Sequence, residues 1–182
     1  LHPETGPHIF TRGEGIHVFD EAGKRYIEGL SGLWCASLGF SEKRLADAAA
    51  HQLRTLPFYH NFAHKAVLPA IELADYLVSR APVPMSKVFF TNSGSEANDT
   101  QVKLVWYYNN ALGRPTKKKI IARHKGYHGT TLGAAGLTGL PSFHKLFDVP
   151  LPPFLHTDAP YFYRGALPGE SEEDYATRLA QS

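Results

Sequence analysis

The 182 residues of the chain are 43% hydrophobic and 20% charged, a composition typical of one α/β globular domain. A net charge of +2 argues against a nucleic-acid-binding protein, because such proteins cluster many Lys and Arg residues. The one dense basic run, 117–119, is interpreted as the solvated end of a loop. Cys35 is the only cysteine, which excludes an internal disulfide and fits a reducing, cytoplasmic location, and no apolar run is long enough for a transmembrane helix.

Apolar periodicity and turn residues predict the secondary structure in chain order. A hairpin comes first, with Gly23 in its turn, and a glycine-rich loop, 29–39, follows it. Ser41 is expected to cap the next helix and Pro57 to end it. The later pattern alternates strands and helices, which predicts βαβ units and a parallel sheet. The expected elements are strands 17–20 and 25–28, helices 42–55 and 65–80, strand 87–91, helix 95–112, strand 119–122, helix 130–137, strand 154–156 and a helix that opens at the capping box 171–174.

The turn Thr91–Asn98 lies between an expected strand and an expected helix. Gly94 lets a ligand approach the backbone, the N–H groups at the helix start have no helical partner, and the Ser95 hydroxyl is a further donor. The helix dipole also favours an anion at this point. The turn lacks the Gly-Lys-Ser/Thr of a Walker loop and the Gly-x-Gly-x-x-Gly of a dinucleotide site. Two interpretations stay open, a phosphate site on Gly94 and Ser95 or a simple helix cap.

A second motif, Gly126-Tyr127-His128-Gly129, follows the strand 119–122. Glycine on each side allows Tyr127 to lie against a flat heteroaromatic ring. A turn with a packed tyrosine and a surface histidine explains the same residues, and no role is assigned to His128.

Large aromatic residues also occur in two expected loops, at 33–35 and 58–62. Trp34 and Phe62 are candidates for the wall of an apolar pocket or for an interface between proteins. The ten histidines show no metal-binding spacing and there is no second cysteine, so no metal site is expected.

Taken together, these segments resemble the class III aminotransferases of pyridoxal-phosphate (PLP) fold type I, in particular the omega-transaminase or amine–pyruvate group. The resemblance covers nearly the whole chain, including 15–39, 56–59, 89–98 and 126–129. It implies an α/β fold in which residues 1–40 are the N-terminal hairpin segment of the small domain and residues 41–182 begin the large parallel-sheet PLP-binding domain. Family members are much longer, so the chain is expected to be a truncated front portion.

The resemblance also implies roles for individual residues. The backbone of Gly94 and Ser95, with the Ser95 hydroxyl, would hold the PLP phosphate, and Tyr127 would stack on the pyridine ring. Trp34 would line the substrate pocket, and Phe62 would reach the active site of the other subunit in a homodimer. The Schiff-base lysine of the family lies beyond the matched region, so no residue of this chain is named as catalytic.

The function implied by the resemblance is transfer of an amino group from an amine or omega-amino acid to a keto acid such as pyruvate, with PLP as cofactor. The complete protein is then an enzyme, and the segment alone is expected to be inactive. Two alternatives stay open. One is another PLP enzyme of the same fold, such as a mutase or decarboxylase, and the other is a non-catalytic fragment or interaction module.

Overall fold

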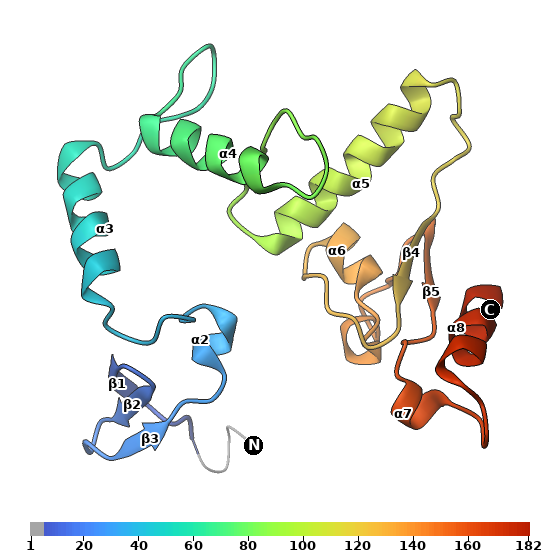
Figure 1. Cartoon of the computed structure of the whole chain (residues 1–182), viewed down its shortest axis with the longest axis horizontal. Helices are drawn as coiled ribbons and strands as arrows, with labels where there is room; N and C mark the ends of the chain where they lie inside the picture. Colours follow the sequence, from blue (N-terminus) through green and yellow to red (C-terminus); the bar gives the residue numbers. More distant parts are fainter. Residues whose placement is uncertain (1–5) are drawn as a thin grey trace. The chain divides into compact units, whose positions relative to one another are not determined.

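The computed structural model describes residues 6–182, and internal contacts divide the chain into two units, with the boundary in the sequence between Ser86 and Lys87. The first unit contains β1 (Phe10–Glu14), β2 (His17–Asp20), β3 (Arg25–Ile27), α2 (Ser31–Trp34), α3 (Lys43–Thr55) and α4 (Leu68–Arg80) (Figure 1). The second contains α5 (Gly94–Ala111), β4 (Ile120–Arg123), α6 (Leu132–Leu137), the 3-10 helix η1 (Pro141–Phe143), β5 (Phe154–Thr157), α7 (Phe162–Gly165) and α8 (Glu172–Gln181). The expected division between residues 40 and 41 concerns the domains of the complete family fold and stays a prediction.

The predicted hairpin is confirmed as β2 and β3, and β1 adds a third antiparallel strand beside β2. The turn forms because the Asp20 carboxylate accepts hydrogen bonds from the N–H groups of Ala22 (3.0 Å) and Lys24 (2.9 Å), while Gly23 has a φ of 79°. β1 was not predicted, because its residues, FTRGE, show no alternation of apolar and polar side chains. Only its pairing with β2 reveals it.

Both predicted helices of the first unit form, although their starts differ from the expectation. Glu42, and not Ser41, caps α3: its carboxylate accepts from Arg44 N at 3.2 Å, whereas the Ser41 hydroxyl donates to Gly13 O at 2.6 Å. α4 begins at Leu68, three residues later than predicted, because the Asn61 side chain accepts from Val67 N at 3.1 Å before the first turn. Neither helix buries a side chain within the described residues.

The second unit is a βαβ arrangement in which β4 and β5 pair in parallel, as predicted (Figure 1). Its core joins α5, β4, α6 and β5 through the buried side chains of Val102, Ala122, Leu137 and Phe154. The predicted strand at 87–91 is wrong, since these residues pair with no strand of the described chain. An extended segment becomes a strand only where a neighbour accepts and donates its ladder hydrogen bonds.

The C-terminal helix α8 begins at the predicted capping box. The Ser171 hydroxyl accepts from Asp174 N at 3.1 Å and donates to the Asp174 carboxylate at 2.7 Å. Beside it, the Glu170 carboxylate accepts two hydrogen bonds from the Arg178 guanidinium, at 2.7 and 2.8 Å. Within residues 6–182, no helix combines the length and the apolar character that crossing a membrane requires.

The Glu170–Arg178 pair predicts an acid-sensitive part of the stability. Hydrogen bonds from Arg178 lower the pKa of Glu170 from its ordinary value of 4.5 to about 2. Because the folded pKa lies below the unfolded one, the contribution of the pair is complete above about pH 4.5 and is lost as the pH falls toward 2. We expect the difference in unfolding free energy between the wild type and Glu170→Gln, measured by denaturant titration of the intact protein, to shrink across this interval. A difference that is constant with pH would contradict the assignment.

Candidate functional site

The N-terminus of α5 presents two backbone donors without partners. Ser93 caps the helix: its hydroxyl accepts from Glu96 N at 3.2 Å, and the Glu96 carboxylate accepts from Asn92 N at 2.8 Å. Among the described residues, nothing accepts a hydrogen bond from the N–H of Gly94 or Ser95. A Cβ placed on Gly94 would meet no atom within 4 Å, so the space beside the Gly94 Cα is open. An 18-residue helix adds its dipole, which makes this end suitable for an anion.

Three side chains of α5 attach it to the segment that follows β4. The Ser95 hydroxyl accepts from Thr130 N at 3.1 Å, which leaves its own hydrogen available to a ligand. The Asn98 amide donates to His128 O at 2.7 Å, and the Asp99 carboxylate accepts from Ala134 N at 3.0 Å. The interpretation of the sequence missed Asn98 and Asp99. Their spacing of three and four residues from Ser95, which places all three on one helix face, was the available signal.

The motif Gly126–Gly129 is therefore a turn that packs against the start of α5. Gly129 has a φ of 130°, and a Cβ there would collide with the Ser95 hydroxyl and lie 2.8 Å from the Ala134 Cβ. Only glycine permits this approach. The contribution of His128 to the turn comes from its backbone, since its N–H donates to the fully buried Thr138 hydroxyl at 2.9 Å.

Tyr127 lies in the same turn with 58% of its surface exposed. Its ring contacts Phe143 edge to face, with ring centres 5.5 Å apart and planes inclined by 65°. The base of the turn is held by Gly139, whose N–H donates to Gly126 O at 2.8 Å and whose carbonyl accepts from Lys125 N at 2.8 Å. The structure thus brings Gly94, Ser95 and the Tyr127 turn together within the second unit.

Trp34 ends an unusual turn in the first unit, within the loop 29–39. Ser31, Gly32, Leu33 and Trp34 have φ values of 51°, 58°, 63° and 65°, so α2 is a single left-handed turn. A left-handed conformation costs about 1–2 kcal/mol for each non-glycine residue. Such strain is concentrated at functional sites in proteins. The Trp34 side chain is 73% exposed, so the turn presents it outward.

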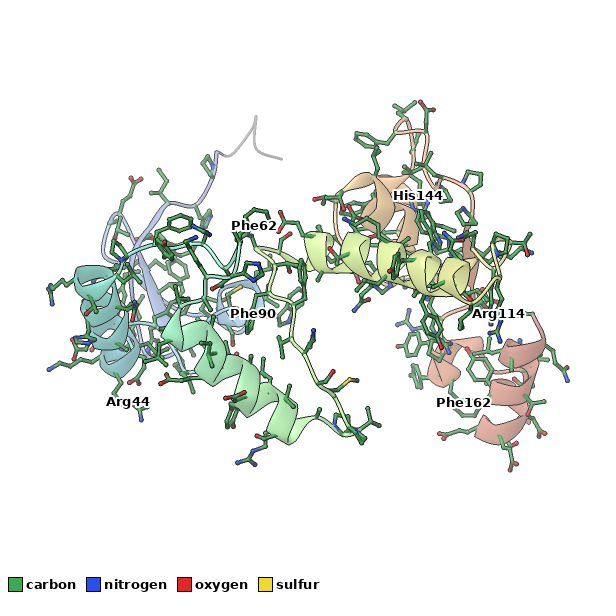
Figure 2. All side chains as sticks on the ribbon, turned by 90° about the horizontal axis from the view of Figure 1, so that it is seen from above. Arg44, Phe62, Phe90, Arg114, His144 and Phe162 are labelled. Carbon is green, nitrogen blue, oxygen red and sulfur yellow. The ribbon has the colours of Figure 1, made fainter. Side chains whose placement is uncertain are left out.

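Phe62 belongs to the exposed aromatic loop 58–62 of the first unit and is labelled in Figure 2. The loop is held locally: Phe62 N donates to the His60 ring at 3.3 Å, and Lys65 N donates to Phe62 O at 3.2 Å. Phe62 as a whole is 77% exposed. Across residues 6–182, no three side chains of His, Cys, Asp or Glu gather in a way that could hold a metal ion.

Comparison with solved structures shows that the chain is similar to omega transaminases over its whole length. The chain matches a crystal structure of the omega transaminase from Pseudomonas jessenii in complex with PMP, with a TM-score of 0.96 and 64% identity, over 100% of this chain and 40% of that one. A thermostable variant of the Pseudomonas jessenii enzyme matches with the same TM-score and 63% identity. The mixed α/β fold is thus the fold of this part of those transaminases.

Comparison with curated proteins and families agrees with the structures. Residues 2–181 match the model of the family "Aminotransferase class-III". The chain is 58% identical to gamma aminobutyrate transaminase 1, mitochondrial, of Solanum lycopersicum, over 98% of this chain and 35% of that protein. It is also 58% identical to vanillin aminotransferase of Capsicum chinense, over 97% of this chain and 39% of that protein. The chain therefore spans between a third and two fifths of these relatives, and it belongs to the class III aminotransferases.

Proposed function

We propose that this chain supplies the phosphate-binding and ring-stacking part of a PLP-dependent aminotransferase, which transfers an amino group from an amine or omega-amino acid to a keto acid such as pyruvate. The observation that carries the proposal is the pair of unpartnered N–H groups of Gly94 and Ser95 beside open space at the start of α5. The names of the relatives support the reaction class. They include transaminases of gamma-aminobutyrate, an aminotransferase of vanillin, and a solved transaminase with L-alanine.

The residues present fit the cofactor. The phosphate would accept hydrogen bonds from the N–H groups of Gly94 and Ser95 and from the Ser95 hydroxyl, with added attraction from the helix dipole. Tyr127, in the turn that packs on this helix end, would cover the pyridine ring. When bound, PLP supplies an electron sink for the carbon that carries the amino group. The group that moves the proton is proposed to lie outside this chain.

Loss of the Ser95 hydroxyl tests the phosphate site. Ser95→Ala in the intact protein is expected to weaken PLP affinity by roughly tenfold or more, because a charge-assisted hydrogen bond is lost. The measurement is a titration of the apoprotein with PLP, followed by absorbance. Ser171→Ala serves as the matched control, because it removes a hydroxyl that accepts from one backbone N–H at another helix start. Equal PLP affinity for Ser95→Ala and the control would refute the phosphate site.

We propose further that Trp34 and Phe62 line the amine pocket. One solved omega transaminase was engineered for bulky amines by changing a tryptophan to glycine, and another by changing that tryptophan together with a phenylalanine 28 positions later and an arginine. Trp34 and Phe62 are also 28 positions apart, and the chain is 62% and 61% identical to these two variants over its whole length. Both side chains are largely exposed within this chain, which leaves them free to contact a substrate.

A homodimer accounts for the exposure of Phe62. Phe58 and Phe62 of the same loop are 82% and 77% exposed, and neighbouring exposed apolar side chains are typical of a surface that a partner covers. We propose that Phe62 enters the active site of the opposite subunit in a two-fold dimer. A crystal structure of the intact protein is expected to show this arrangement. Phe62 buried wholly within its own subunit would contradict it.

A further inference from the structure

The left-handed turn α2 is held at its start by a side chain outside the turn, that of Glu28. One carboxylate oxygen of Glu28 accepts from Leu30 N at 3.0 Å, and the other accepts from Gly32 N at 2.7 Å. The two donors flank Ser31, the first residue of the turn with a positive φ, and precede Leu33 and Trp34. A carboxylate that satisfies two otherwise unpaired N–H groups stabilises the turn as a capping residue stabilises a helix.

Glu28 is itself fixed to the antiparallel sheet of the first unit. It directly follows β3, and its N–H donates to Ile16 O at 2.9 Å. The far end of the loop is anchored as well, because Gly15 and Phe40 exchange two backbone hydrogen bonds of 3.0 and 2.7 Å. Glu28 thus connects the first residues of the turn to the sheet, because its backbone bonds to the sheet and its carboxylate bonds to the turn.

The hand of the turn decides where Trp34 points. In a left-handed turn the Cα–Cβ bonds project differently from those of a right-handed turn, since the two backbones are near mirror images. Within the turn, Trp34 N donates to Leu30 O at 2.8 Å. A right-handed turn can form the same backbone hydrogen bond, so this bond does not determine whether the turn is left- or right-handed. The Glu28 carboxylate, which accepts from Leu30 N and Gly32 N together, binds the turn from outside in its observed conformation.

We infer that Glu28 is a positioning residue for the amine pocket: its carboxylate holds α2 in the left-handed conformation and so fixes the orientation of the Trp34 indole. The inference rests on the proposed function, in which Trp34 lines that pocket. Glu28 touches neither substrate nor cofactor in this assignment, and it acts through the turn.

The test is Glu28→Gln in the intact protein, with two readouts. The amide keeps one acceptor oxygen and replaces the other with an NH₂ donor, so one of the two backbone N–H groups loses its partner. Hydrogen exchange of the peptide covering 29–35 is expected to accelerate roughly tenfold. The ratio of kcat/KM for a bulky to a small amine is expected to shift about fivefold, in the direction produced by Trp34→Ala, because a misplaced wall changes the productive geometry. Glu21→Gln, at an exposed carboxylate in the β2–β3 turn, is the charge-matched control and should change neither readout.

The two readouts separate the possible outcomes. Unchanged hydrogen exchange at 29–35 would show that the Glu28 carboxylate does not hold the turn. Faster exchange with an unchanged amine ratio would show that Glu28 stabilises the turn without positioning Trp34 for the substrate, which would also overturn the inference. If Trp34→Ala itself leaves the amine ratio unchanged, the proposed pocket fails, while the exchange measurement still decides whether Glu28 holds the turn. Should Glu28→Gln not fold, Glu28→Asp, whose carboxylate is one carbon shorter, is expected to shift both readouts in the same direction by a smaller factor. An Asp variant identical to the wild type in both would also overturn the inference.

Discussion

Gly129→Ala is expected to reduce PLP affinity by more than about 100-fold, the combined result of a steric clash and backbone strain. The new Cβ would collide with the Ser95 hydroxyl and lie 2.8 Å from the Ala134 Cβ and 3.0 Å from the Ser95 Cα. Two of these neighbours belong to Ser95 and the third lies on the buried helix α6, so relief of the clash requires the Ser95 hydroxyl to leave its position or the turn to move away from α5. Moving the turn away from α5 displaces Ser95 from the phosphate site and Tyr127 from the pyridine ring at the same time.

The effect of the clash can be separated from the effect of the backbone conformation. Gly113→Ala is the matched control, because Gly113 also has a positive φ, of 70°, but a Cβ there would meet nothing within 4 Å. We expect this control to lower the stability by about 1 kcal/mol and to leave PLP affinity unchanged. The measurement is a PLP titration of both apoproteins together with their thermal unfolding. Wild-type PLP affinity in Gly129→Ala would show that the turn does not pack against the helix start.

Trp34→Ala is expected to change the ratio of kcat/KM for bulky and small amines by roughly 10- to 200-fold in favour of the bulky amine, since pocket volume discriminates substrates on this scale. The indole is 73% exposed in this chain, so its removal leaves no cavity in the core of the first unit. The melting temperature should therefore change little. Steady-state kinetics with two amines of different size provide the measurement.

Trp106→Phe is the contrasting variant for the same measurement. The Trp106 indole packs against the core of the second unit and donates to Lys118 O at 3.0 Å. Its replacement should lower the melting temperature and leave the amine ratio unchanged. If Trp34→Ala instead behaves like Trp106→Phe, with lower stability and an unchanged ratio, then Trp34 is a packing residue and the proposed pocket is wrong.

Features that depend on residues close together in the chain could be predicted from the sequence. The β2–β3 hairpin follows from a turn in which Asp20 and Gly23 satisfy local requirements. The parallel pair β4 and β5 follows from alternating strand and helix patterns, and the Ser93–Asn98 segment shows its helix start through its own residues. Membership of the class III aminotransferases could likewise be predicted from short motifs, because each motif consists of residues that are consecutive in the sequence.

The tertiary structure alone decided the features that join residues far apart in the chain. Asn98 and His128 are 30 positions apart, and the need for glycine at position 129 arises from Ser95, which no local pattern indicates. The segment 87–91 has the composition of a strand, yet it forms none in the described chain because a strand requires a partner. The left-handed turn at Ser31–Trp34 is disfavoured by its own residues, three of which are not glycine. It is held by the hydrogen bonds that Leu30 N and Gly32 N donate to the Glu28 carboxylate and by the anchoring of the loop to the sheet, so its conformation follows from contacts and not from propensity.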